Sequence, residues 1–313
     1  MKTLYIIGNG FDIAHGLGTN YESFREWLLE KGHSYFVENM EMFFSHWDRE
    51  GQRDQLWYDF ERAIGACDFE ETYDMFAQQS MEYFGEGVEY LRDIKNTSDE
   101  HFTIPLLYEM PQLFTQWIEN KNAKIANIGN EKLRLKNIAE EDIFLTFNYT
   151  DTLEQAYDIP SSNICHIHNR VSAGEQPIVG HNIKFKINVP YDMTKGESEL
   201  KQSLADVLNS YQKNYKSNIN RNLDFFNQID NEVENICCYG HSLGEIDLPY
   251  FKNIKKRISD SAHWIFYIYR GEDDELFMRN KNAVLTFIMR MRLDKNKCKA
   301  YDSYYMNQEI QLN

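Results

Sequence analysis

Glycines and small polar side chains that follow short apolar runs are the residues of this chain best placed to do chemistry. The first set is the turn Gly8-Asn9-Gly10-Phe11-Asp12. Glycines allow positive φ and a close backbone approach, and the free N–H groups of a following helix attract phosphate. The turn therefore predicts a phosphate-binding site for a nucleotide, with a tight turn that binds nothing as the alternative.

Asp12 and Ile13 stand where a dehydrogenase fingerprint has its third glycine, and no acidic residue follows at the end of a second strand. A dehydrogenase is therefore disfavoured. Asp12 comes just after the turn, near where a ribose or a carboxamide would lie. It is either a binding residue or a helix cap.

Asn148 stands where an apolar run passes into a helical pattern, in the segment Phe147-Asn148-Tyr149-Thr150-Asp151. An amide at the end of a strand can hold a water or a ribose hydroxyl without adding charge beside the substrate, so we expect it to be functional. Asp151 and Glu154 fall in the first helical turn, where acids suit the helix dipole without any ligand.

His166 and His168 alternate along one apolar run and are expected on the same face of the sheet. His168 is nearer the carboxyl end and is the candidate base, because imidazole titrates near neutral pH. His166 is expected to be a core residue. A zinc site built from these two with His181 and His241 lacks clear ligand spacing, and no metal is expected.

The segment Gly240-His241-Ser242-Leu243-Gly244 follows a very apolar run. It fits the Gly-x-Ser-x-Gly pattern of a hydrolase elbow. The only later histidine is His263, at the start of an apolar run, whereas a hydrolase needs its base on a loop. We therefore expect the segment to contact a nucleotide through its backbone and small side chains.

These groups have to be positioned by strands, and the apolar runs predict an α/β protein with a Rossmann-like parallel sheet and helices on both faces. Open parallel sheets bind ligands beyond the carboxyl ends of their strands, so the polar residues that follow these runs should share one site. The expected strands are 3–8, 143–147, 164–168, 178–180, 236–239 and 264–269.

Residues 20–140 have helical spacing and are expected to form a helical insertion after the first strand and turn, with Trp27, Trp57 and Trp117 buried. Residues 183–235 are polar and rich in Lys and Asn, and they predict a second helical insertion. The whole chain, 1–313, is expected to be a single α/β domain.

Bulk composition narrows the function. The formal charge of −16, from 33 basic and 49 acidic residues, argues against a general nucleic-acid binder. Five cysteines without metal-ligand spacing suggest neither a disulfide framework nor a zinc site. The chain enters its first strand without an apolar segment for export or membrane spanning, which predicts a cytoplasmic protein that does not bind membranes.

The motifs together resemble the bacteriophage abortive-infection AbiH family over nearly the whole chain. The resemblance rests on Gly8-Asn9-Gly10-Phe11-Asp12, His15-Gly16-Leu17-x-Thr19-x-Tyr21, Phe147-Asn148-Tyr149-Thr150-x-Thr152, His166-Ile167-His168 and Gly240-His241-Ser242-Leu243. The same order of parts is more distantly similar to the sirtuin-like fold of antiphage NAD hydrolases. Thr150 and Asn169 depart from that pattern, which has Asp and Gly there. The sirtuin zinc module is absent, which disfavours lysine deacylation.

The resemblance implies that the chain binds NAD and hydrolyses its nicotinamide–ribose bond, with Asn148 as the catalytic amide and His168 as the catalytic histidine. The cofactor contacts expected around them are Gly8, Asn9, Gly10, Phe11, Asp12, Asp151, His241 and Ser242. Such a toxic activity has to be held inactive by a trigger, by a homo-oligomeric state or by a partner defence protein. Two alternatives are an NAD or ADP-ribose sensor that does not cleave its ligand, and a metal-dependent nuclease.

Overall fold

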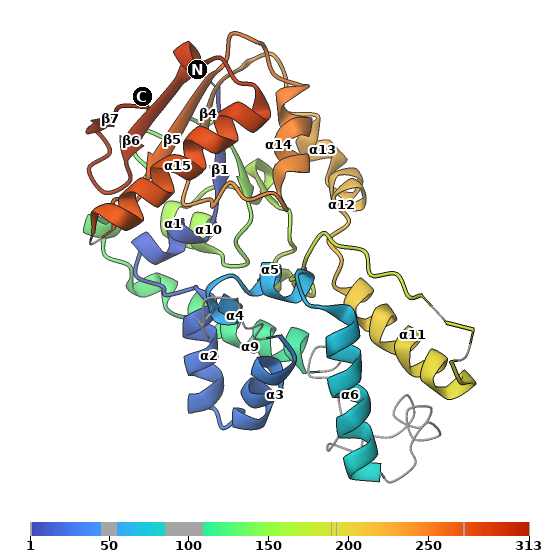
Figure 1. Ribbon diagram of the computed structural model, residues 1–313. Helices are drawn as coiled ribbons and strands as arrows, with labels where there is room; N and C mark the ends of the chain where they lie inside the picture. The colour runs from blue at the N-terminus through green and yellow to red at the C-terminus, as the bar shows by residue number, and fades with distance from the viewer. Residues whose placement is uncertain are drawn as a thin grey trace. The chain divides into compact units, whose positions relative to one another are not determined.

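The computed structural model describes residues 2–44, 55–84, 109–188, 190–191, 193–271 and 273–312 (Figure 1). Its internal contacts divide the chain into two compact units. The first unit comprises Met1–Thr19, Ile118–Pro177 and Asn214–Asn313, and the second comprises Asn20–Trp117 and Ile178–Lys213. All residues expected to bind or cleave NAD lie in the first unit.

The first unit is built on a seven-stranded sheet. Its strands are β1 (Lys2–Ile7), β2 (Ile143–Thr146), β3 (Ile164–His166), β4 (Val233–Tyr239), β5 (His263–Ile268), β6 (Cys298–Asp302) and β7 (Glu309–Ile310). Its α-helices are α1 (Asn9–Ala14), α10 (Thr152–Tyr157), α12 (Tyr215–Arg221), α13 (Leu223–Phe226), α14 (Leu248–Lys255) and α15 (Asp274–Met291). Short 3-10 turns occur at Ile125–Asn127, Asn130–Lys132, Ser161–Asn163, Val171–Ala173 and Lys295–Lys297.

The strand order is β3-β2-β1-β4-β5-β6-β7, and every pair is parallel except the antiparallel pair β6–β7. The sheet grows from β1 toward β3 and then, on the other side of β1, from β4 outward, so its topological switch point lies between β1 and β4. Ile7 pairs with both Thr146 and Tyr239, and Thr146 pairs with His166. The last residues of four adjacent strands are therefore in register.

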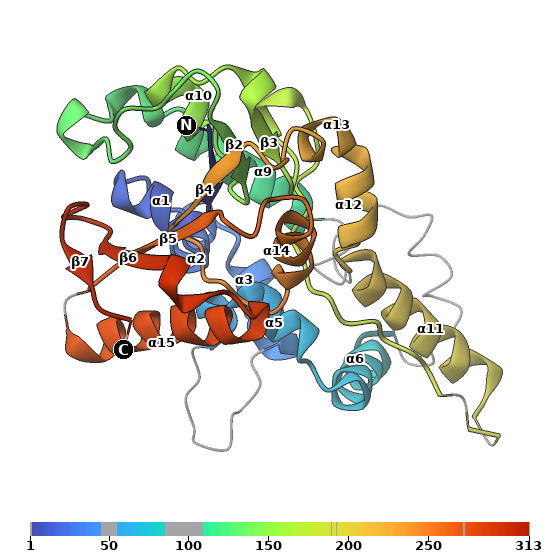
Figure 2. The same ribbon diagram turned by 90° about the horizontal axis from the view of Figure 1, so that it is seen from above.

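Alternating side chains of the strands pack into two separate apolar clusters, one on each face of the sheet. Leu4 and Ile6 belong to the larger cluster, to which α13, α14 and α15 contribute. Ile7 belongs to the smaller cluster, together with Phe11 of α1 and Leu153 of α10. Seen from above, α1 and α10 lie on one side of the strands and α14 and α15 on the other (Figure 2). The predicted α/β sheet with helices on both faces is confirmed.

The second unit is helical in its described part. Its helices are α2 (Tyr21–Glu30), α3 (Ser34–Phe44), α4 (Gln55–Tyr58), α5 (Phe60–Gly65), α6 (Phe69–Phe84), the greater part of α9 (Met110–Asn122) and α11 (Lys195–Ser210). Trp57 and Trp117 are buried as expected, at 7% and 1% exposure. Trp27 is only partly buried, because the inward face of α2 is formed by Phe24 and Leu28.

The strand predictions differ from the structure in several places, and β4 begins at Val233 rather than at residue 236. Residues 178–180 form no strand, and only His181 makes an isolated bridge, to Gln212 in the second unit. The third predicted strand ends at His166, because Ile167 and His168 form a turn, although the Ile167 N–H still donates to the Thr146 carbonyl oxygen at 3.1 Å. Strands β6 and β7 were not expected, since they are short and mix polar with apolar residues at the sheet edge.

Candidate functional site at the carboxyl edge of the sheet

The turns that follow β1 and β4 are packed directly against each other at the switch point. Gly10 donates its N–H to the Gly240 carbonyl oxygen at 2.8 Å, and Gly8 donates to the Tyr239 carbonyl oxygen at 3.0 Å. Gly240 has a φ of +67°, and a Cβ placed on it would lie 2.2 Å from the Phe11 nitrogen. These glycines are therefore required by the close approach of two backbones.

The N–H groups in the first turn that were expected to meet phosphate are largely paired within the protein. The N–H of Phe11 donates to the Gly8 carbonyl oxygen at 2.9 Å, in addition to the bonds of Gly8 and Gly10. The side chains of Asn9 and Ser242 are exposed at the two turns, and Asn9 accepts a hydrogen bond from Thr19. A ligand at the switch point can reach these two side chains.

The Gly-x-Ser-x-Gly segment does not form a hydrolase elbow. An elbow needs a sharp strand-to-helix turn at the serine, but α14 begins only at Leu248. His241 is used locally. Its Nδ1 accepts the Leu243 N–H at 2.9 Å, so its Nε2 carries the ring proton and faces the Asp247 carboxylate at 3.4 Å.

Asp12 is a buried carboxyl inside α1 and is only 1% exposed. The N-cap residue of this helix is Gly8, and no side chain caps the helix. Asp12 is therefore not a helix cap. Thr150 and Thr152 donate hydroxyl hydrogen bonds to its two oxygens, at 2.5 Å and 2.8 Å. Burial raises the pKa of Asp12 to about 6, although hydrogen bonds from these threonines and from Asn148 oppose the shift.

Asn148 is the second residue after the end of β2, and it is buried, with 6% exposure. Its side-chain amide donates to the Gly8 carbonyl oxygen at 3.1 Å, which joins the ends of β1 and β2. Its backbone N–H donates to the Thr146 hydroxyl at 3.1 Å, and its carbonyl oxygen lies 3.2 Å from Nδ1 of His166. Asn148 is thus bonded to residues at the ends of three strands, through its side chain to Gly8 and through its backbone to Thr146 and His166.

His168 is 2% exposed and lies among aromatic rings. Its ring centroid is 5.3 Å from that of Phe147 and 6.1 Å from that of Tyr149, the two neighbours of Asn148 in sequence. Phe147 also contacts the ring of His241, with 4.3 Å between centroids. The rings of His168 and His241 therefore both lie against Phe147, the residue before Asn148.

The prediction that His166 and His168 share a face of the sheet is wrong. His166 pairs with Glu154 of α10, on the side of the smaller cluster. His168 contacts Phe147 and Tyr250, which belong to the larger cluster on the opposite face. The alternation of a strand does not extend past His166, where β3 ends.

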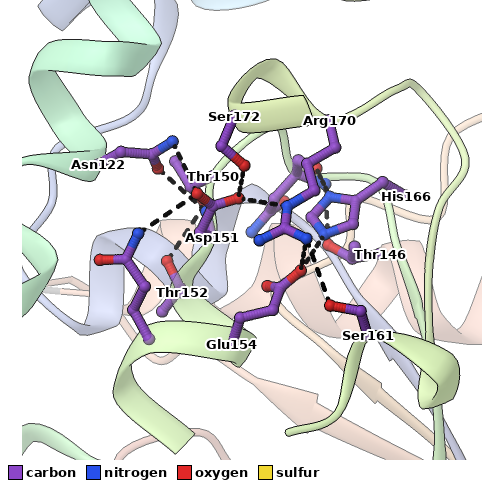
Figure 3. Close-up of polar contacts among 12 residues, drawn as sticks. Asn122, Thr146, Thr150, Asp151, Thr152, Glu154, Ser161, His166, Arg170 and Ser172 are labelled. Atoms are coloured by element: carbon purple, nitrogen blue, oxygen red, sulfur yellow. Dashed lines mark hydrogen bonds and ion pairs between the residues drawn. The ribbon is translucent and has the colours of Figure 1, made fainter. Parts of the chain in front are cut away.

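Asp151 is the centre of a buried ion-pair network rather than a free carboxylate (Figure 3). One of its oxygens accepts from Arg170 Nε and from Ser172 Oγ, both at 2.8 Å. Glu154 lies 3.4 Å from Arg170 Nη1 and 2.9 Å from His166 Nε2. The network ties the loop that carries Asn148 to the loop that carries His168.

Asp151, Glu154 and His166 also offer ligand atoms within 4.8 Å of one another, as a metal site does. Arg170, however, contacts both carboxylates and already supplies the positive charge that a metal would bring. A cation here would have to displace the guanidinium. These residues fit an ion-pair network better than a metal site.

Sequence reasoning missed the residues that hold the site together. Arg170 and Ser172 stand in a loop without any motif, and their role depends on a carboxylate some twenty positions away in the chain. Asn122, at the end of α9, bonds both the N–H and the carboxylate of Asp151. Such long-range polar contacts leave no periodic signal in a single sequence.

The fold and the site define an α/β protein with a polar, partly buried edge at the switch point of a parallel sheet. The model of the bacteriophage abortive infection AbiH family matches residues 4–269, and the chain belongs to this family. No curated protein and no solved structure matches the chain. None of the helices in the described ranges combines the length and apolar character that crossing a membrane requires.

Proposed function

We propose that this AbiH-family chain binds NAD and hydrolyses its nicotinamide–ribose bond, depleting NAD in an infected cell. The observation that carries the proposal is the in-register ending of β1 to β4, which brings Asn148, His168 and His241 to one edge. The order β3-β2-β1-β4-β5-β6 matches that of doubly wound dinucleotide-binding sheets, whose ligands lie at the switch point.

The two departures from the sirtuin-like pattern, which on their own favour a sensor that does not cleave NAD, both fit the structure. Asn169, in place of glycine, has a φ of +72°, a region that asparagine tolerates better than other side chains. Thr150, in place of aspartate, bonds the carboxyl of Asp12 at 2.5 Å, so an acid still occupies this part of the site.

Cleavage of an N-glycosidic bond passes through a state with oxocarbenium character and needs an oriented water. In the proposed roles, the Asn148 amide holds the water or a ribose hydroxyl and His168 acts as the base. Asn9 and Ser242, exposed at the two turns, contact the dinucleotide.

The test is release of nicotinamide from NAD by the full-length chain. Asn148→Ala is expected to abolish turnover while leaving the circular dichroism spectrum and much of the NAD affinity intact. His168→Ala is expected to retain a pH-shifted residual rate, because loss of a general base typically costs about 10² to 10⁴-fold. Matched controls are Asn296→Ala and His263→Ala, which change exposed residues before β6 and at the start of β5. Wild-type rates in both site variants would remove this site from the mechanism.

A second candidate function is binding of NAD or an ADP-ribose derivative without cleavage, with signalling through a partner protein. The enclosure of His168 by Phe147, Tyr149 and Tyr250 favours it, because a base surrounded by rings exchanges protons slowly with water. Calorimetry decides between the two. Tight NAD binding by the wild type without any nicotinamide release supports the sensor.

A further inference from the structure

His166 makes a hydrogen bond through each nitrogen of its ring. Nδ1 lies 3.2 Å from the backbone carbonyl oxygen of Asn148, and Nε2 lies 2.9 Å from Oε1 of Glu154. A carbonyl oxygen can only accept a hydrogen bond, so Nδ1 carries a proton. Whether Nε2 carries a second proton depends on what Glu154 offers it.

Oε1 of Glu154 also faces a second donor (Figure 3). Nη1 of Arg170 lies 3.4 Å from this oxygen, and a guanidinium can only donate. Oε1 is therefore an acceptor toward both neighbours. An Nε2 without a proton would set its lone pair against this acceptor at 2.9 Å, so Nε2 carries a proton as well.

The balance of charge leads to the same state of His166. Asp151 and Glu154 are two buried acids, with side chains 3% and 10% exposed, and the single guanidinium of Arg170 contacts both. One cation for two carboxylates leaves a net negative charge in a buried place, where an unpaired charge is costly. A second cation at His166, whose side chain is 7% exposed, removes this imbalance.

We propose that His166 is an imidazolium and a positioning residue, which holds the backbone carbonyl of Asn148 through Nδ1 while Glu154 retains its second proton. A charged donor forms a stronger hydrogen bond than a neutral one, so the end of β3 fixes the peptide that follows Asn148. The charged groups around His166 are Glu154, Asp151, Arg170 and, at longer range, Asp12 of α1. The catalytic meaning rests on the proposed function, but both the protonation and the hydrogen bond can be measured without turnover.

His15 provides a control for the protonation in the same spectrum. Its Nδ1 also faces a carbonyl oxygen, that of Phe11 at 2.6 Å, but its Nε2 faces the hydroxyl of Tyr157, which can donate, at 2.6 Å. Burial also lowers the pKa of His15. Nitrogen-15 NMR of the imidazole rings at pH 7 should therefore show protons on both nitrogens of His166 and on Nδ1 alone of His15.

Glu154→Gln removes the charge that retains the second proton but keeps the size of the side chain. The glutamine amide can donate to Nε2, so His166 is expected to become neutral with its remaining proton on Nδ1. Glu175→Gln is the matched control, because Glu175 is exposed and bonds the backbone N–H of Arg170; His166 should be unchanged in it. A neutral His166 in the wild type, or an imidazolium that survives Glu154→Gln, overturns the proposal.

Two substitutions of His166 separate its two nitrogens. The amide nitrogen of asparagine can take the place of Nδ1, whereas that of glutamine can take the place of Nε2. The carbon-13 shift of the Asn148 carbonyl reports its hydrogen bond, and it should move in His166→Gln and stay near the wild-type value in His166→Asn. Labelling Asn carbonyl carbons and Tyr nitrogens isolates three peptide bonds, of which the other two are internal controls: Asn20–Tyr21, Asn148–Tyr149 and Asn214–Tyr215. An unmoved Asn148 signal in His166→Gln would show that Nδ1 does not hold this carbonyl.

The kinetic measurement is nicotinamide release by the same two variants. His166→Gln is expected to lower kcat by about 10²-fold with little change in KM, the cost of a slightly misplaced catalytic group. His166→Asn should retain most of the wild-type kcat, and equal losses in both variants would contradict a positioning role. If the wild type releases no nicotinamide, the proposed function fails, and the two NMR measurements still decide whether His166 is an imidazolium that holds Asn148.

Discussion

Replacing Gly240 by alanine tests whether the site depends on the contact between the two turns. The residue has a φ of +67°, and its added Cβ would lie 2.2 Å from the Phe11 nitrogen and 2.5 Å from the Gly10 carbonyl carbon. Both neighbours are backbone atoms, so no side-chain rotation can relieve the overlap. The turn after β1 or the turn after β4 has to move.

The expected loss can be estimated from three parts. A left-handed backbone costs a non-glycine residue roughly 1–2 kcal/mol. Overpacking against fixed atoms typically adds about 1–3 kcal/mol. The Gly10 to Gly240 hydrogen bond of 2.8 Å would also be strained, and such a bond is worth about 1 kcal/mol. We therefore expect Gly240→Ala to lower the free energy of unfolding by about 3–6 kcal/mol.

Gly174 supplies the matched control for this measurement. It also has a positive φ, +74°, but nothing lies within 4 Å of an added Cβ. Gly174→Ala should therefore show only the backbone cost, roughly 1–2 kcal/mol in urea unfolding followed by circular dichroism. Equal losses in the two variants would mean that the turns do not press on each other, and the switch-point packing would be refuted.

Two further predictions concern buried polar groups. Arg170→Met leaves the Asp151 carboxylate buried without its cation, and it should lower the free energy of unfolding by about 3 kcal/mol. Adding Asp151→Asn should restore part of this loss. If the effects of the two substitutions simply add, the ion pair is contradicted. Burial lowers the pKa of His15, whose Nε2 lies 2.6 Å from the Tyr157 hydroxyl, so the unfolded chain takes up its proton at higher pH. Stability should therefore fall as the pH drops below 6.5, and a His15→Gln variant with an unchanged slope between pH 7.5 and 5.5 would disprove this link.

The central strands could be predicted from sequence because each one is a short run rich in apolar residues. Residues 143–147 and 264–269 are strands to within a residue of the expected limits. Strand β6 was not predicted because Lys299 and Asp302 interrupt its apolar residues. A run that mixes polar and apolar residues without regular alternation resembles a loop in sequence.

The site was predictable only where it follows from topology. Once β1 to β4 are neighbours, residues directly after them must lie together, which places Gly8, Asn148 and Gly240 without further information. The orientation of each side chain depends instead on partners far away in sequence. Thr150 and Asp12 are 138 positions apart, and no local sequence pattern predicts their hydrogen bond of 2.5 Å.

The same distinction explains why Asp12 could not be assigned from sequence. In sequence, an acid just after a glycine turn looks like a helix cap, whose side chain accepts hydrogen bonds from backbone N–H groups within three residues. Asp12 is satisfied by hydroxyls and an amide from the loop after β2, which keeps an acid in a position where burial disfavours its charge. An uncharged residue there would avoid that cost. A carboxylate held at this edge against its own desolvation is better explained by a role in the candidate site than by stabilisation of the fold.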